Sequence, residues 1–272
     1  MLITRFATAI VLLAVWVSAL LFLPNVWWTA LLLPVLLVAG WEWGGLTGLA
    51  RGARWMFAGF VLASATFVWL LVGRSEPAVG RLTAPELLIY GIGSTFWLFI
   101  ALAWLARRWA MRSPLALGAV GWIVLVPAWL AIARLQENPG QLLAMLAIIW
   151  LADTAAYLSG RAWGKHKMAP SISPGKTWEG AAGAVAAVAV YYFIMSRAVP
   201  EWGWWHGFGG ALLFAGVTIM SVVGDLFESG VKRQAGVKDS GTLLPGHGGV
   251  LDRIDSMTAA LPAAALLLPY AG

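Results

Sequence analysis

Residues 206–227 read HGFGGALLFAGVTIMSVVGDLF, an apolar run in which Asp225 is the only carboxylate. A helix needs roughly 20 consecutive apolar residues to cross a bilayer, so this run is long enough to span one. The chain contains further apolar runs, separated by short polar loops, near residues 6–24, 26–41, 55–73, 87–106, 115–133, 141–160, 179–197 and 254–270. We therefore predict an all-α, polytopic membrane helix bundle with about nine transmembrane helices.

The composition of the chain supports a membrane location. Of the 272 residues, 61% are hydrophobic and 11% are charged, and the mean hydropathy is +0.81. This balance excludes a soluble globular domain. The lack of cysteine excludes disulfides, thiolate nucleophiles and cysteine-bound zinc. No small-residue cleavage site follows the first apolar stretch, so we interpret residues 6–24 as a retained helix rather than a signal peptide.

Basic residues divide unequally between the two sets of loops. With the N-terminus in the cytoplasm, 14 of the 18 basic residues fall in cytoplasmic segments: Arg5, Arg51, Arg54, Arg107, Arg108, Arg112, Arg161, Lys165, Lys167, Lys176, Lys232, Arg233, Lys238 and Arg253. The other four, Arg74, Arg81, Arg134 and Arg197, fall outside. Because Lys and Arg are retained on the cytoplasmic side, this asymmetry predicts an N-in, C-out orientation. The net charge of +6 follows from the same bias and requires no nucleic acid as a partner.

Chemically active side chains concentrate in the second half of the chain. All aspartates and all lysines follow residue 150: Asp153, Asp225, Asp239, Asp252, Asp255, Lys165, Lys167, Lys176, Lys232 and Lys238. An acid in or at the end of a span is costly unless it meets a cation, a partner or water, so these acids are functional candidates. Within one integral membrane unit we therefore distinguish an N-terminal transmembrane scaffold, residues 1–140, from a C-terminal catalytic part, residues 141–272.

Two pairs of carboxylates occur at helical i, i+3 spacing: Asp225 with Glu228, and Asp252 with Asp255. Neighbouring carboxylates repel each other, and a divalent cation removes that repulsion. We favour a metal-binding role for Asp225, with a salt bridge to Lys232 or Arg233 as the alternative. For Asp252 and Asp255 the alternative is a purely structural role at the start of the last helix, and it has more weight because the helix dipole favours acids in a first helical turn.

Asp153 is a third acidic candidate, placed by helical spacing on roughly the same face as Tyr157 and Arg161. Its spacing fits a functional acid and also fits a packing residue that is hydrogen-bonded to a neighbour. Gly175–Lys176–Thr177 superficially matches the end of a P-loop, but Pro170 stands where that motif needs its first glycine. We therefore reject a P-loop at this position.

Two hydrophilic segments, residues 160–180 and 229–249, combine lysine, arginine, hydroxyl groups and glycine. Such segments suit a polyphosphate, since glycine lets backbone N–H groups approach oxygen atoms while Lys and Arg neutralise their charge. The alternative is a flexible basic loop that faces anionic lipid. His247, between Gly246 and Gly248, is the histidine that we expect to contact a phosphate.

The residues from Ser229 to Asp255 form an extended pattern: Ser-x-Val-Lys-Arg, four residues, Lys-Asp-x-Gly, and then Leu-Pro-x-His-Gly-Gly-Val-x-Asp-Arg-Ile-Asp. This pattern resembles the signature of phosphatidate cytidylyltransferases, which are also called CDP-diacylglycerol synthases. The segments 153–161 and 173–180 are also similar to that family, so the resemblance covers about residues 150–256. The first 140 residues match the family only in hydropathy.

The resemblance implies a polytopic, homodimeric enzyme of the bacterial cytoplasmic (inner) membrane, with its active site facing the cytoplasm and membrane lipids around it. Its substrates would be CTP and phosphatidate from the bilayer, and its cofactor Mg²⁺, with a second, monovalent cation left open. It implies metal ligation by Asp225 and Asp252, with Asp255 nearby. The remaining implied site residues are Lys232, Arg233 and Lys238 for catalysis, and Lys176, Ser229, His247, Asp153, Arg161, Ser173, Asp239 and Gly248 for substrate binding.

Three other functions compete with this interpretation. A CTP-dependent polyprenol or phytol kinase would share CTP and Mg²⁺ and differ only in its acceptor. A CDP-alcohol transferase would need an Asp-Gly, Ala-Arg, Gly, Asp, Asp series along adjacent helices, which the sequence lacks. An ion-coupled transporter would place acids near mid-span on several helices, whereas here the acids gather near predicted cytoplasmic helix ends.

Overall fold

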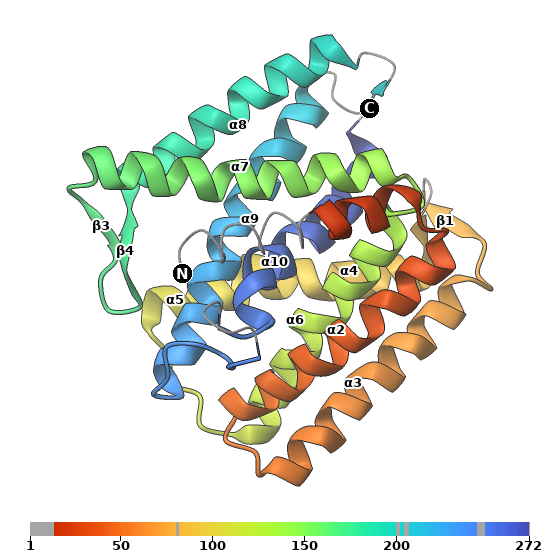
Figure 1. Cartoon of the computed structure of the whole chain (residues 1–272), viewed down its shortest axis with the longest axis vertical. Helices are drawn as coiled ribbons and strands as arrows, with labels where there is room; N and C mark the ends of the chain where they lie inside the picture. The colour runs from red at the N-terminus through yellow and green to blue at the C-terminus, as the bar shows by residue number, and fades with distance from the viewer. Residues whose placement is uncertain (1–13, 80–81, 200–201, 204–206, 244–247, 272) are drawn as a thin grey trace.

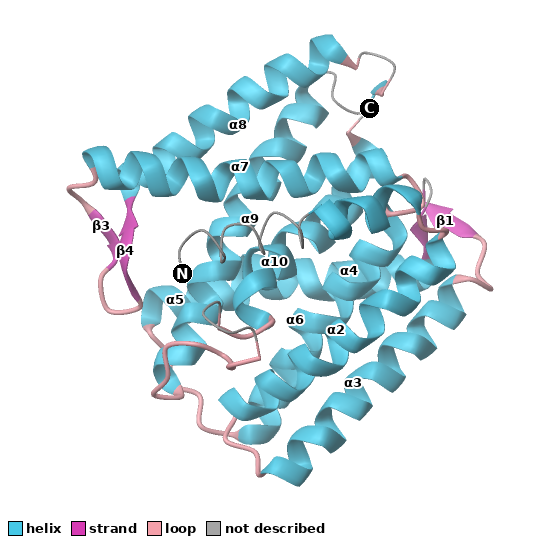
Figure 2. Ribbon diagram, in the orientation of Figure 1, coloured by secondary structure: helices cyan, strands magenta, loops and turns pink. Residues whose placement is uncertain are grey.

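The computed structural model describes residues 14–79, 82–199, 202–203, 207–243 and 248–271 (Figure 1). Within this part, helices make up most of the structure (Figure 2). The helices are α2 (Asn25–Leu46), α3 (Arg51–Val72), α4 (Ala84–Thr95), α5 (Leu102–Arg107), α6 (Pro114–Leu135), α7 (Pro139–Trp163), α8 (Trp178–Ala198), α9 (Gly207–Gln234) and α10 (Leu251–Leu267). A π-helical segment (Phe96–Ala101) joins α4 to α5, and a 3-10 turn (Leu268–Tyr270) follows α10.

The described helices are those of an integral membrane protein. Seven are long and apolar enough to cross a bilayer: α2, α3, the continuous α4–π–α5 unit, α6, α7, α8 and α9. Two of the nine predicted spans are not among these seven helices. The run 6–24 is described only from residue 14 onward, where residues 14–22 are helical. The run 254–270 folds as α10, whose 17 residues and closing 3-10 turn are shorter than those seven helices.

Successive helices run in alternate directions, so the loops gather at two opposite ends of the bundle (Figure 1). One end carries the α2–α3 turn, residues 108–113, the hairpin that precedes α8 and the segment between α9 and α10. The other end carries the hairpin β1 (Pro77–Val79)–β2 (Leu82–Thr83) and the α6–α7 turn. Hydrophilic segment 160–180 and the described residues of segment 229–249 therefore lie at the same end.

The segment 160–180 is more ordered than the loop that its composition suggests. Strands β3 (Lys167–Ala169) and β4 (Ser173–Thr177) pair as an antiparallel hairpin, with Lys167 opposite Thr177. The Thr177 side chain then accepts a hydrogen bond from Gly180 N–H and caps the start of α8. This hairpin fixes Lys176 beside α9, where the ammonium group contacts the Val222 carbonyl.

Helix α9 continues about two turns beyond the end of its apolar run and ends at Gln234. Two side-chain contacts at i, i+4 support this extension: the Ser229 hydroxyl donates to Asp225, and Lys232 pairs with Glu228. Residues that we expected in a loop, Ser229 to Arg233, are therefore helical. Their side chains are held at helical spacing rather than on a flexible segment.

Helix α10 lies near the centre of the bundle and packs against α9, α6 and α4. A glycine allows its close approach to α9, because a Cβ at Gly224 would lie 2.5 Å from the Asp255 carbonyl oxygen. An aromatic cluster holds the same part of α9. Phe227 is fully buried and makes edge-to-face contacts with Phe96, Trp97 and Trp104 of the α4–π–α5 unit.

Candidate active site

Five carboxylates and two lysines converge where α7, α9, α10 and β4 meet. They are Asp153, Asp225, Glu228, Asp252 and Asp255, with Lys176 and Lys232. Asp225 interacts electrostatically with both Asp153 and Asp255, and Asp255 interacts with Glu228. The structure thus brings together acids that are far apart in the sequence. Ser256, which directly follows Asp255, donates a hydrogen bond of 3.3 Å to Asp153 across 103 residues.

Asp225 is held by partners on both sides. Its carboxylate lies 2.8 Å from the Lys176 ammonium, which β4 delivers, and accepts a hydrogen bond of 3.3 Å from the Ser229 hydroxyl. The expected alternative partners, Lys232 and Arg233, are not the ones that the structure pairs with it. The side chains of Asp225 and Lys176 are 29% and 23% exposed, so the pair remains open to a substrate.

Asp252 is the most extensively bonded acid of the cluster. Its Oδ1 lies 2.5 Å from the Lys232 ammonium. Its Oδ2 accepts hydrogen bonds from the backbone N–H groups of Ser240 (2.9 Å) and Gly249 (2.7 Å). Gly248 has a positive φ of 83°, and a Cβ there would lie 2.7 Å from Oδ2, so glycine is required at this close approach.

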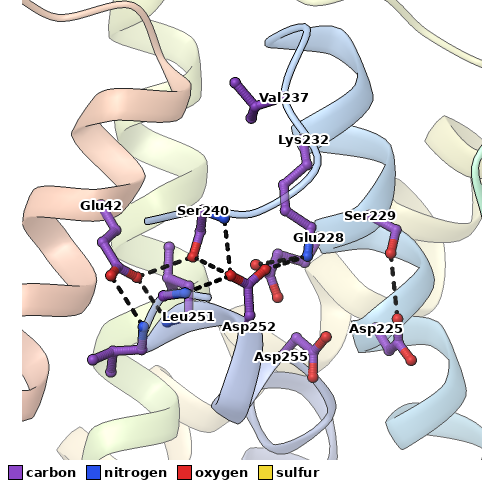
Figure 3. Close-up of polar contacts among 12 residues, drawn as sticks. Glu42, Asp225, Glu228, Ser229, Lys232, Val237, Ser240, Leu251, Asp252 and Asp255 are labelled. Atoms are coloured by element: carbon purple, nitrogen blue, oxygen red, sulfur yellow. Dashed lines mark hydrogen bonds and ion pairs between the residues drawn. The ribbon is translucent and has the colours of Figure 1, made fainter. Parts of the chain in front are cut away.

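The space between Asp225 and Asp252 contains three further charged side chains: Lys232, Glu228 and Asp255. Lys232 is buried and also lies 3.4 Å from Glu228. Neither Glu228 carboxylate oxygen has a hydrogen-bond partner among the described residues, although the residue is only 4% exposed. Figure 3 shows the Asp255 carboxylate between those of Asp252 and Asp225. A buried acid without hydrogen bonds is costly, so this region favours an additional positive charge.

The cluster fits a hard divalent cation by its chemistry. Its ligating atoms are carboxylate oxygens, which suit Mg²⁺, and its five acids outnumber its two lysines. In the described part of the chain no three acidic or histidine side chains already form a complete ligand set. Mg²⁺ is commonly bound by one or two carboxylates plus substrate phosphates, so an incomplete protein set is suited to a nucleotide-bound ion.

Comparison with known proteins places the chain in a family. A family model described as the cytidylyltransferase family matches residues 3–271. The chain belongs to the cytidylyltransferase family. The match extends over the first 140 residues, where the sequence pattern offered only hydropathy, and it confirms the resemblance seen in residues 150–256.

Three curated relatives of this chain share one name. The phosphatidate cytidylyltransferase of Haemophilus influenzae is 37% identical over 276 residues, which cover 95% of this chain and 95% of the relative. The phosphatidate cytidylyltransferase of Pseudomonas aeruginosa is 39% identical over 285 residues, covering 98% of this chain and 97% of the relative. That of Brucella suis is 51% identical over 120 residues, covering 44% of this chain and 43% of the relative.

The structure describes the other predicted site residues except His247. Arg233 links the two hydrophilic segments, because its guanidinium donates to the carbonyls of Ile172 and Val237, both at 3.2 Å. Lys238 and Asp239 are exposed on the segment before α10, and Ser173 is half-buried in β4. Arg161 donates to the Tyr157 hydroxyl at 3.1 Å, as the helical spacing predicted. His247 lies outside the described residues.

One acid at this site was missed by the sequence analysis. Glu42 of α2 is 1% exposed, and its carboxylate meets the segment before α10 (Figure 3). A signal was present, since Glu42 directly follows the apolar run 26–41 and an acid at the end of a span is a functional candidate. The concentration of aspartates after residue 150 drew attention to the second half alone.

Proposed function

We propose that this protein is a phosphatidate cytidylyltransferase, which transfers the cytidylyl group of CTP to phosphatidate and forms CDP-diacylglycerol and pyrophosphate. The observation that carries the proposal is the match over at least 95% of the chain to two proteins of that name. The acidic cluster supports it, because carboxylates and lysines at the end of a membrane bundle suit a charged nucleotide beside a lipid substrate.

In this proposal Asp225 and Asp252 hold Mg²⁺, with Asp255 beside them, and the ion supplies positive charge against the triphosphate. Lys176 and Lys232 lie within salt-bridge distance of these aspartates, so their ammonium groups can also contact phosphate oxygens. Further contacts to the nucleotide or the lipid phosphate come from the surrounding residues: Arg161, Ser173, Ser229, Arg233, Lys238, Asp239, His247, Gly248 and Asp153.

The reaction needs positioning and charge neutralisation more than proton transfer. A phosphate oxygen of phosphatidate forms a bond to the α-phosphorus of CTP, while the bond from that phosphorus to the oxygen bridging to the β-phosphate breaks. The bonding electrons leave with pyrophosphate. The attacking oxygen is already anionic, so no strong general base is required. Stabilising the negative charge on the equatorial oxygens and the leaving group therefore dominates catalysis.

The proposal also includes a location and an assembly. The site faces the cytoplasm of a bacterial inner membrane, because the positive-inside rule favours an N-in chain and every hydrophilic segment of the site then lies inside. CTP arrives from the cytoplasm, and phosphatidate keeps its acyl chains in the bilayer. We also propose that the enzyme is a homodimer. A monovalent cation beside Mg²⁺ is tested by varying K⁺ and Na⁺ in the assay below.

A reconstitution assay tests the function. Purified protein in detergent is incubated with CTP, Mg²⁺ and phosphatidate, and CDP-diacylglycerol and pyrophosphate are measured. Parallel reactions replace phosphatidate with a polyprenol, add EDTA, or vary K⁺ and Na⁺. We expect both products only with phosphatidate and only without EDTA. A phosphorylated polyprenol, or product formation in EDTA, would contradict the acceptor or the metal respectively.

A further inference from the structure

Glu42 belongs to the N-terminal half of the chain, yet its carboxylate bonds only to the C-terminal segment in the hydrogen bonds of the described residues. Its Oε1 accepts from the Val250 N–H at 3.0 Å. Its Oε2 accepts from the Leu251 N–H at 2.9 Å and lies 3.0 Å from the Ser240 hydroxyl. Figure 3 shows the Glu42 side chain extending from α2 toward Ser240 and Leu251.

These bonds cap the start of α10. The first N–H groups of a helix have no partner inside the helix, and α10 receives no side-chain cap from its own N-cap residue, Val250. Glu42 supplies the missing acceptor to Val250 and Leu251 from another helix. Its negative charge also lies at the positive end of the α10 dipole, which stabilises the helix start further.

Ser240 extends this contact to the proposed metal ligand Asp252. Its hydroxyl lies 3.0 Å from Glu42 Oε2 and 3.1 Å from Asp252 Oδ2, and its backbone N–H donates to the same Oδ2. A hydroxyl has one proton, so it donates to one carboxylate at a time. When that proton serves Glu42, the backbone N–H still holds Asp252. Glu42 therefore fixes both the segment and the helix turn that orient Asp252.

Two glycines allow the segment to close on Glu42. A Cβ added at Gly241 would lie 2.3 Å from Glu42 Oε1, and one added at Gly249 would lie 2.5 Å from Oε2. Any side chain at these positions would displace the carboxylate or the backbone. The segment before α10 is thus shaped around an acid from α2 as well as around Asp252.

We propose that Glu42 is a positioning residue of the active site, which orients Asp252 through Ser240 and the first turn of α10. The inference rests on the proposed function, in which Asp252 holds Mg²⁺. Partners that orient a metal ligand typically contribute about 10–100-fold to metal affinity or activity when they are removed. Glu42 would play this part although it lies some two hundred positions from Asp252 in the sequence.

The carboxylate form of Glu42 is what the geometry requires. Glutamine at this position keeps the shape but replaces one acceptor oxygen with an NH₂ donor. In either amide orientation that NH₂ would face a backbone N–H, of Val250 or of Leu251, and leave it without an acceptor. Glu42→Gln therefore tests the contact with little change in volume.

The experiment compares Glu42→Gln with the wild-type protein in detergent. We expect kcat to fall about 10–100-fold and the Mg²⁺ concentration for half-maximal stabilisation against heat to rise by a similar factor. The Mg²⁺ titration is done with CTP but without phosphatidate, so it does not depend on turnover. We expect the KM for phosphatidate to stay within about twofold, because an oriented metal ligand acts on the chemical step more than on lipid binding.

Glu86→Gln is the matched control. Glu86 lies in the N-terminal half and is as buried as Glu42. Its partners are Arg134, at 2.6 Å, and Thr83, and neither contacts Asp252 among the described hydrogen bonds and ion pairs. This variant should lower thermal stability and leave the Mg²⁺ midpoint unchanged. A wild-type Mg²⁺ midpoint and kcat in Glu42→Gln would overturn the inference.

A variant of Ser240, whose hydroxyl lies between Glu42 and Asp252, tests the inference if Glu42→Gln does not fold. Ser240→Ala leaves the two backbone bonds of Glu42 intact and removes only the hydroxyl between the two carboxylates. A raised Mg²⁺ midpoint supports the positioning role, and an unchanged one overturns the route through the Ser240 hydroxyl. If wild-type protein made no CDP-diacylglycerol, the proposed function would fail, while the Mg²⁺ titration without phosphatidate would still test the role of Glu42.

Discussion

The Lys232 ammonium lies between the carboxylates of Glu228 and Asp252, and the three side chains are 9%, 5% and 5% exposed. Removing the cation from such a site leaves two buried acids facing each other. We predict that Lys232→Met lowers the free energy of unfolding by about 3–5 kcal/mol, the usual cost of breaking a buried ion pair from one side. Denaturant unfolding in a fixed detergent measures the change.

Two further variants make the Lys232 prediction specific. Lys165→Met removes an exposed lysine at the same end of the bundle and should leave the stability unchanged. Adding Glu228→Gln to Lys232→Met removes one of the two unpaired acids and should recover part of the loss. A stable Lys232→Met protein would mean that the two acids do not depend on this cation.

Variants of Asp225 and Asp252 test the site through its activity rather than its stability. We predict that Asp225→Asn and Asp252→Asn each lower kcat by at least about 100-fold, because an amide is a weaker ligand for Mg²⁺ and carries no charge. Both proteins should remain folded, as judged by size-exclusion chromatography and thermal unfolding. Glu76→Gln, an exposed acid near the opposite end, should keep normal turnover. Near-normal rates in either aspartate variant would remove that residue from the site.

At the level of elements, the crossing of α9 and α10 sets the distance between the acids that they bear. Gly224 lies at that crossing, where a Cβ would be 2.5 Å from the Asp255 carbonyl oxygen and 3.2 Å from the Ala259 Cβ. We predict that Gly224→Ala forces the two helices apart, costs about 1–3 kcal/mol of stability and lowers turnover. Thermal unfolding and the reconstitution assay measure both effects.

Gly216→Ala provides the control for this crossing, because it lies on the same helix and its Cβ would meet only the end of the Leu267 side chain, at 3.4 Å. A flexible side chain can adjust, so the protein should keep its stability and its turnover. If Gly224→Ala behaved in the same way, the separation of α9 and α10 would not control the site.

The elements differ in how far their sequence determines them. The spans α2 to α9 follow from the length of their apolar runs, because a bilayer leaves a long apolar segment little choice but a helix. The last two turns of α9 were not predictable in this way, since they depend on Glu228–Lys232 and Asp225–Ser229 contacts. The β3–β4 hairpin was missed for a related reason: short strands in a polar segment have no periodic apolar pattern.

At the level of the whole molecule, thiol labelling measures the orientation in the membrane. The chain has no cysteine, so a single introduced cysteine is the only thiol. We predict that a membrane-impermeant maleimide applied to intact cells labels Glu76→Cys and does not label Ala110→Cys until the cells are permeabilised. The two residues are exposed in loops at opposite ends of the bundle. The reverse labelling pattern would place the active site outside the cytoplasm.

The convergence of distant acids is the part of the site that the sequence only suggested. The i, i+3 spacing predicted that Asp225 and Glu228 share a face, and likewise Asp252 and Asp255. It could not predict that Lys176 pairs with Asp225, because that contact depends on how a hairpin is placed against another helix. Pairing between helices is set by packing of the entire bundle, which no local pattern encodes. The roles of these residues in catalysis stay predictions.

The acid that α2 contributes to the start of α10 has a consequence for engineering. Chimeric enzymes are often made by joining the front half of one relative to the back half of another. Here such an exchange would separate Glu42 from the segment shaped to receive it. A functional hybrid would therefore need α2 and the segment before α10 to come from the same parent.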